Sequence, residues 1–229
     1  MNWLVNALTS TIGRKILMAL TGLFLILFLV AHLVGNLQLL KGDNGEAFNV
    51  YAQFMGHNPL VQAISVLNFS FILLHIVVSI LLTQRNRKAR PVQYAHERNH
   101  STWNSRNMGI LGTIILAFLV VHLRTFWYRS KFGEMNMISY EGVEMKNLYE
   151  VTVVAFQEWW LVALYVAAMA VLAFHLAHGF QSAFQTFGLN HPKYTPLIKK
   201  LGLAFSIVVP AGFAVIPVYM FLAGQGVFS

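Results

Sequence analysis

The sequence predicts an all-α membrane protein with five transmembrane helices, and two observations support this class. Hydrophobic residues make up 57% of the 229-residue chain and charged residues only 10%, against roughly 45–50% and about 25% in soluble domains. The apolar residues also form runs long enough to cross the hydrocarbon core of a bilayer, which requires about 20 residues of helix. We expect a single domain, residues 1–229, because the chain is too short for several large ones.

Five apolar segments are the predicted spans. They cover about residues 16–40, 60–83, 108–128, 158–187 and 201–222. The fourth apolar stretch begins earlier, at Val151, and is too long for a perpendicular span, so Glu158, Trp159 and Trp160 are the expected outer boundary. The connection from Ser130 to Glu150 is predicted to form an ordered outer cap.

Basic residues are concentrated in the connections on one side of the predicted bundle. They are Arg14, Lys15, Arg85, Arg87, Lys88, Arg90, Arg98, Arg106, Lys193, Lys199 and Lys200. The connections on the other side are rich in acids, namely Asp43, Glu46, Glu134, Glu141, Glu144, Glu150 and Glu158. Because cytoplasmic connections carry the excess of Lys and Arg, we expect a bacterial cytoplasmic membrane protein with its N-terminus inside and its C-terminus outside. The net charge of +8 is therefore explained by orientation in the bilayer rather than by nucleic-acid binding.

Four histidines, one in each of the first four predicted spans, are the candidate functional residues. They are His32, His75, His122 and His178. An imidazole among apolar side chains costs free energy unless its nitrogens have partners, so metal binding or proton transfer is the usual reason for one there. The chain has no cysteine, which excludes thiolate-held clusters and thioether-attached haem. The pattern predicts haem that is held without a covalent link.

The depth of the histidines predicts how they pair. His32 and His122 lie on the order of 10–12 Å from the outer ends of their spans, at 1.5 Å per helical residue. His75 and His178 lie roughly 14–15 Å from the inner ends. We therefore expect a haem-binding four-helix bundle plus one peripheral helix, with an outer and an inner bis-histidine haem b. Iron with both axial positions filled favours electron transfer over oxygen chemistry.

A second histidine competes for the inner position. His175 lies one helical turn before His178, on a similar face and at a depth that also permits ligation. We favour His178, because the adjacent Gly179 would let a porphyrin edge approach the backbone. His175 is then either the alternative ligand or a hydrogen-bond donor to the haem.

Arginines near the span ends are candidates for binding the anionic haem propionates. Arg124 and Arg129 suit the outer haem, and Arg14 and Arg106 suit the inner one. Ordinary anchoring at the membrane interface is the alternative interpretation. Arg124 lies deeper than a purely topological charge requires.

A quinone site requires hydrogen-bond partners for two carbonyls beside an apolar cleft near a haem. The connection after the first span offers polar side chains between several aromatic residues, namely Gln38, Glu46, Gln53 and His57. An inner site is the alternative, built from Gln181, Ser182 and Arg106.

Local motifs extend this pattern to a family. The sequence reads AHLVGN at Ala31–Asn36, VHLRTFWY at Val121–Tyr128, and FHLAHGFQSAFQTFG at Phe174–Gly188, with His75 in the second span. Over essentially its whole length the chain resembles the five-helix, di-haem cytochrome b subunit of succinate:quinone and quinol:fumarate oxidoreductases, the complex II enzymes of respiration. The resemblance also selects His178 as the ligand and pairs the first helix with the third and the second with the fourth.

The resemblance implies an electron-transfer and membrane-anchor subunit rather than an enzyme in itself. Such subunits hold a flavoprotein, which carries the succinate and fumarate chemistry of the tricarboxylic acid cycle, and an iron–sulfur protein that relays electrons. This chain would exchange those electrons with quinone, and its single-subunit, two-haem type resembles those that commonly use menaquinone.

One departure from the family concerns proton movement. Some members carry a membrane glutamate two residues before the last ligand, where this sequence has Leu176, so a carboxylate proton route is not expected. The alternatives are the cytochrome b subunit of a hydrogenase or formate dehydrogenase, and a haem-free transporter or anchor. A transporter with histidine proton relays would need acidic partners inside the spans, and the apolar middle of each span has none.

Overall fold

The computed structural model describes residues 2–89 and 102–227, and most of this chain is helical. In chain order the elements are α1 (Asn2–Thr9), α2 (Thr11–Asn36), the 3-10 helix η1 (Leu37–Leu40), α3 (Glu46–His57), α4 (Pro59–Lys88), α5 (Trp103–His122), the π-helix η2 (Leu123–Tyr128), α6 (Arg129–Phe132), β1 (Met137–Tyr140), β2 (Val143–Lys146), α7 (Leu148–Ala155), α8 (Trp159–Thr186) and α9 (Thr195–Gly224).

Five helical segments are long and apolar enough to cross a membrane, as the sequence predicts. They are Thr11–Leu40, Pro59–Lys88, Trp103–Phe132, Trp159–Thr186 and Thr195–Gly224. Several begin earlier or end later than the apolar runs, because a helix continues past the hydrocarbon boundary until a capping residue ends it. The Asn58 side chain, for example, accepts from the backbone N–H groups of Leu60 and Val61 and starts α4.

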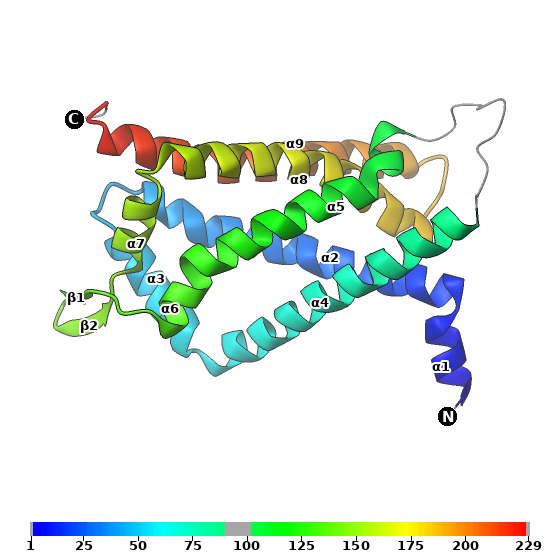
Figure 1. Cartoon of the computed structure of the whole chain (residues 1–229), viewed down its shortest axis with the longest axis horizontal. Coiled ribbons are helices and arrows are strands. Elements are labelled where there is room, and N and C mark those ends of the chain that lie inside the picture. The colour runs from blue at the N-terminus through cyan, green and yellow to red at the C-terminus, as the bar shows by residue number, and fades with distance from the viewer. Residues whose placement is uncertain (1, 90–101, 228–229) are drawn as a thin grey trace.

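Two helices form the centre of the bundle. α2 and α8 pack on each other, α4 packs on α2, and α5 packs on α8 (Figure 1). The helix without a histidine, α9, lies along α8 and also contacts α2. It continues through Pro210 and Pro217, both of which are buried in this packing. α4 and α5 contact each other only slightly, so the side of the bundle between them is the least closed.

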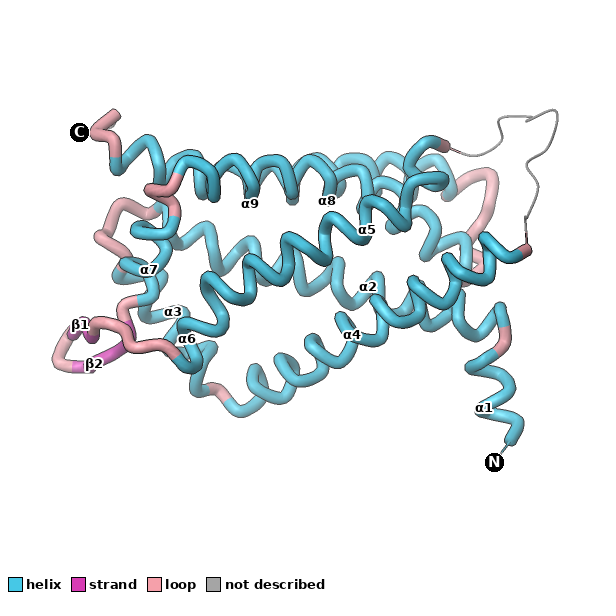
Figure 2. Tube along the Cα trace, viewed as in Figure 1, coloured by secondary structure: helices cyan, strands magenta, loops and turns pink. Residues whose placement is uncertain are grey.

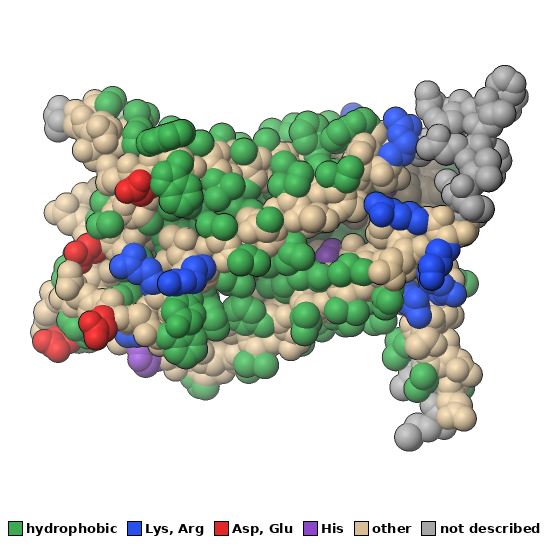
Figure 3. Space-filling view, viewed as in Figure 1, with side chains coloured by type: hydrophobic (Ala, Val, Ile, Leu, Met, Phe, Trp, Pro, Cys, Tyr) green, Lys and Arg blue, Asp and Glu red, His purple; other side chains and the backbone are tan. Residues whose placement is uncertain are grey.

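The two ends of the bundle differ in charge. The N-terminus and the C-terminus lie at opposite ends, and the connections gather there as loops (Figures 1 and 2). Lys and Arg side chains gather at the end that carries α1, whereas the other end shows Asp and Glu beside some Lys and Arg side chains (Figure 3). We call these the basic end and the acidic end. They correspond to the predicted inner and outer sides.

An ordered cap covers the acidic end, where the Ser130–Glu150 connection contributes a β-hairpin. β1 and β2 pair antiparallel, with Tyr140 opposite Val143. Glu141 and Gly142 turn the chain with φ angles of 52° and 82°, the left-handed pair of a type I′ hairpin turn. Asn49 of α3 ties the cap together: its amide donates to Asn147 at 3.1 Å, and its oxygen accepts from the Tyr149 backbone N–H at 2.9 Å.

The fourth apolar stretch is broken near the expected outer boundary. α7 ends at Ala155 and α8 begins at Trp159, with Glu158 in extended conformation between them. Trp159 and Trp160 are exposed, as residues at a membrane interface are expected to be. The preceding helix, α7, belongs to the cap and contacts α3.

Candidate cofactor site

The outer pair of histidines meets across the bundle as their depth predicts. His32 of α2 and His122 of α5 have ring centroids 5.8 Å apart and perpendicular planes. The two helices run in the same direction, because one span of opposite direction lies between them in the chain, and this brings residues late in the first helix beside residues late in the third.

The inner pair differs from the favoured assignment. The ring of His75 on α4 lies 6.5 Å from that of His175 on α8, whereas His178 makes no ring contact with the described residues. The choice of His178 rested on the small size of Gly179, where a Cβ atom would meet nothing within 4 Å. The ring that contacts His75 in the structure is that of His175, the alternative ligand named from the sequence. Ligation by His178 stays a prediction.

The spacing within each pair suits two axial ligands of one metal. A metal–imidazole bond of about 2.0–2.1 Å, with about 1.1 Å from nitrogen to ring centre, puts two such centroids about 6 Å apart. The Nδ1 atom of His175 is buried and has no hydrogen-bond partner within the described chain. An unsatisfied imidazole nitrogen inside an apolar bundle is costly, so the inner pair fits a bound group.

Two buried hydroxyl groups fix the ring orientation of one histidine in each pair. The Thr21 hydroxyl lies 3.0 Å from Nδ1 of His75 and donates to the Leu17 carbonyl at 2.8 Å, so it can accept from an Nδ1–H group. The Tyr165 hydroxyl lies 3.0 Å from Nδ1 of His122. In both cases Nε2 is left for a metal, which is the arrangement that partners of metal-bound imidazoles impose.

Glycines leave space beside the inner pair. A Cβ atom at Gly22 of α2 would lie 3.5 Å from Cε1 of His75, and one at Gly112 of α5 would lie 3.9 Å from Cε1 of His175. Larger side chains there would fill the region next to the imidazoles. Gly22 of α2 lies beside the inner pair, and His32 of the outer pair follows it on the same helix by ten residues. At 1.5 Å per residue, the two pairs are about 15 Å apart along the helix.

A histidine side chain is visible at the surface in the middle of the bundle (Figure 3). Haem needs only two protein ligands, because the porphyrin supplies four nitrogens. A bare ion needs more, and the described residues contain no group of three or more His, Asp or Glu side chains that could hold one. Paired imidazoles therefore match haem in their number and spacing.

A π-helix directly after His122 is a feature that the sequence analysis missed. η2 spans Leu123–Tyr128, and such wide turns are rare and frequent at functional sites. Arg124 lies on it and is exposed, with its guanidinium 4.9 Å from the centre of the Tyr128 ring. That contact is typical of an interfacial cation, so its propionate role stays a prediction.

The other proposed propionate residues are near the ends of the bundle. Arg129 is exposed and lines an open pocket of about 390 Å³ with Glu134 and Glu150. Arg14 is partly buried at the start of α2, and Arg106 is exposed in the first turn of α5. Their roles toward haem stay predictions.

The outer quinone residues are only partly brought together. Gln53 and His57 share one face of α3, and Nδ1 of His57 lies 2.8 Å from the Gln53 carbonyl. Glu46 and His57 are exposed, whereas Oε1 of Gln38 is buried without a partner in the described chain. On the same helix, Tyr51 packs against Gly35, and burial raises the pKa of its hydroxyl, which keeps it protonated.

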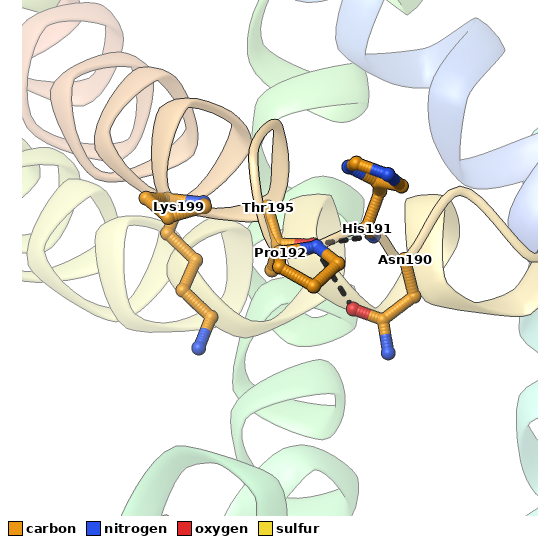
Figure 4. Close-up of a pocket in the computed structure, with 6 residues that line it drawn as sticks. Asn190, His191, Pro192, Thr195 and Lys199 are labelled. Carbon is orange, nitrogen blue, oxygen red and sulfur yellow. Dashed lines mark hydrogen bonds between the residues drawn. The ribbon is translucent and has the colours of Figure 1, made fainter.

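A second pocket lies at the basic end, between α8 and α9, with a volume of about 550 Å³ (Figure 4). Its residues serve the turn: the Thr195 hydroxyl accepts from the His191 backbone N–H and donates to the Asn190 side-chain oxygen. Lys199 also lines it. These local bonds agree with a structural role for His191. His96, His100, Arg90 and Arg98 lie outside the described residues.

Taken together, the structure is that of a helical protein with five helices long and apolar enough to cross a membrane, and two pairs of histidine rings meet between these helices. Comparison with protein families, curated proteins and solved structures finds no match.

Proposed function

We propose that this chain is the membrane-anchor cytochrome b subunit of a succinate dehydrogenase or fumarate reductase. It carries electrons between an iron–sulfur subunit and membrane quinone, menaquinone by resemblance, through two bis-histidine b haems. The observation that supports this most directly is the presence of two imidazole pairs, His32 with His122 and His75 with His175. They lie at two depths and join four helices.

The haem iron would supply one-electron redox chemistry, and the chain supplies position and surroundings. Two imidazoles would hold each iron, which would leave no position on the metal for oxygen or another substrate. The roughly 15 Å step between the pairs along α2 arranges the two sites in series across the membrane. Leu176 of α8 is buried. Because its side chain is apolar, it offers no carboxylate at this position to carry protons.

A reduced-minus-oxidised optical spectrum of the purified chain tests the proposal. We expect the absorption bands of b-type haem and a pyridine haemochrome content of two haems per chain. A well-folded chain, purified from haem-replete cells without any b-type band, would contradict the haem assignment.

The basic end is the proposed docking face for the iron–sulfur protein, which bears the flavoprotein. Its described cations include Arg85, Arg87, Lys88, Arg106, Lys193, Lys199 and Lys200. Because the chain has no cysteine, a Lys199→Cys variant carries one unique cross-linking position. We expect it to capture the iron–sulfur protein, while Glu144→Cys on the hairpin does not. Capture from Glu144→Cys alone would place the partner at the other end.

Quinone is proposed to bind near the outer pair, beside α3. Substituting Gln53 or His57 should raise the KM for quinol and leave both haem spectra intact, because neither residue belongs to a histidine pair. Ser182→Ala is the matched variant for the rival inner site. Kinetics that change only in Ser182→Ala would move the quinone inward.

A further inference from the structure

The first helix leaves the bundle through a turn with a fixed geometry. The Ser10 hydroxyl donates to the Ala7 carbonyl at 2.6 Å and accepts from the Gly13 N–H at 2.9 Å. A Cβ atom at Gly13 would overlap the Ala7 carbonyl oxygen, so glycine permits the close approach of the two helices. α1 therefore projects at an angle from α2 instead of continuing its axis (Figure 1).

α1 has one narrow polar face and a broad apolar one. Asn2, Asn6 and Thr9 fall on one side at helical spacing, and the helix carries no charged side chain. Trp3, 74% exposed, and Val5, 57% exposed, flank this polar face, and Leu8, 43% exposed, lies opposite it. No described part of the chain covers this apolar face.

The position of α1 indicates what covers it. Arg14 and Lys15 follow within two turns and belong to the cluster of cations at the basic end, where positive side chains meet the headgroups of a membrane. The first half of α2 carries an exposed apolar stripe formed by Ile12, Ile16 and Leu20, which begins next to α1. The apolar face of α1 is thus continuous with a surface that faces lipid.

We propose that α1 lies in the plane of the membrane interface at the basic end, with lipid as its partner. Trp3, Val5 and Leu8 sit in the boundary between headgroups and acyl chains, and Asn2 and Asn6 face water. Arg14 and Lys15 bind anionic headgroups beside it. Short helices with this division of faces bind at that depth, and tryptophan is enriched there. The inference does not depend on whether the bundle binds haem.

Spin labels at two positions on opposite faces of α1 test this orientation. The full chain has no cysteine, so Leu8→Cys and Asn6→Cys each give a single labelled site in vesicles that contain anionic lipid. Accessibility to oxygen, which concentrates in the bilayer, is compared with accessibility to a water-soluble nickel complex. We expect the oxygen-to-nickel ratio to be severalfold higher at position 8 than at position 6. Both positions are exposed, so neither variant disturbs packing.

Two results would overturn the proposal. Equal, high accessibility of both labels to the nickel complex would place α1 in water. Shielding of both labels from both reagents would show that protein covers the helix, either a second copy or a docked subunit. Circular dichroism of both variants serves as the control that the helices have formed.

Discussion

The outer and inner histidine pairs share one ligand arrangement but have different surroundings. Aromatic rings enclose the outer pair: Phe28 stacks on His32 at 5.1 Å, and Phe118 and Phe126 lie 5.8 and 5.7 Å from His122. The described structure gives the inner pair no aromatic ring contact apart from that between its two imidazoles. Glycines on α2 and α5 face it instead.

The two pairs therefore differ in the size of the side chains that surround them. Bulky rings surround the outer imidazoles, whereas small residues leave room at the inner pair. A hydroxyl group lies beside one imidazole in each pair, that of Tyr165 at the outer pair and that of Thr21 at the inner pair. We therefore expect the two haems to have distinct spectra and midpoint potentials, because burial and hydrogen bonding both tune them.

Removing a ligand should produce the largest effect and separates the two sites. His32→Ala and His122→Ala should each remove the same outer haem, and His75→Ala should remove the inner one, because loss of the coordinate bond outweighs the remaining packing. Haem quantification and electron paramagnetic resonance of the single variants measure this. If His32→Ala and His75→Ala lost the same spectral species, the two-site comparison would fail.

The choice between His175 and His178 sharpens the inner site. His175→Ala should abolish the inner haem signal, whereas His178→Ala should keep it with a small spectral shift, because only the ring of His175 contacts that of His75. The two variants are matched controls for each other on one helix. Retention of the inner haem in His175→Ala, with loss in His178→Ala, would restore the assignment made from Gly179.

Filling the space beside the inner pair should have an intermediate effect. A Cβ atom at Gly22 would make ordinary contact with His75, 3.5 Å from Cε1, so Gly22→Ala should be tolerated. Gly22→Leu should displace the imidazole and lower inner haem content while the outer haem stays, since overpacking costs about 1–3 kcal/mol. Equal haem loss at both sites in Gly22→Leu would indicate general misfolding instead.

The smallest effect is expected from removing the Thr21 hydroxyl, which lies beside Nδ1 of His75. Thr21→Val preserves shape but removes the acceptor for Nδ1–H of His75, which makes the imidazole a weaker donor to iron(III). The inner midpoint potential should rise, with about 59 mV corresponding to a tenfold change for one electron. Redox titration followed optically measures it, and Thr21→Ser should restore the original value. A shift confined to the outer haem would refute the assignment.

Much of the candidate site could be predicted because apolar periodicity and chain direction determine depth. The pairing of His32 with His122 needed only the lengths of the spans and their alternation. The sequence analysis expected an ordered cap but not its β-hairpin, because only Gly142 of the two turn residues is of a type that favours left-handed φ angles, whereas Glu141 is not. No sequence pattern predicted the π-helix after His122, because the extra residue in its turn depends on packing around the imidazole of His122.

The sequence by itself determined the five spans, the charged ends and the depth of each histidine, since these follow from hydrophobicity and from 1.5 Å of rise per residue. Only the tertiary structure decided which of His175 and His178 meets His75, which hydroxyls orient the rings and where glycine leaves space. Those outcomes depend on how each helix is rotated about its axis. In an almost uniformly apolar helix that rotation is set by contacts with neighbouring helices rather than by its own pattern.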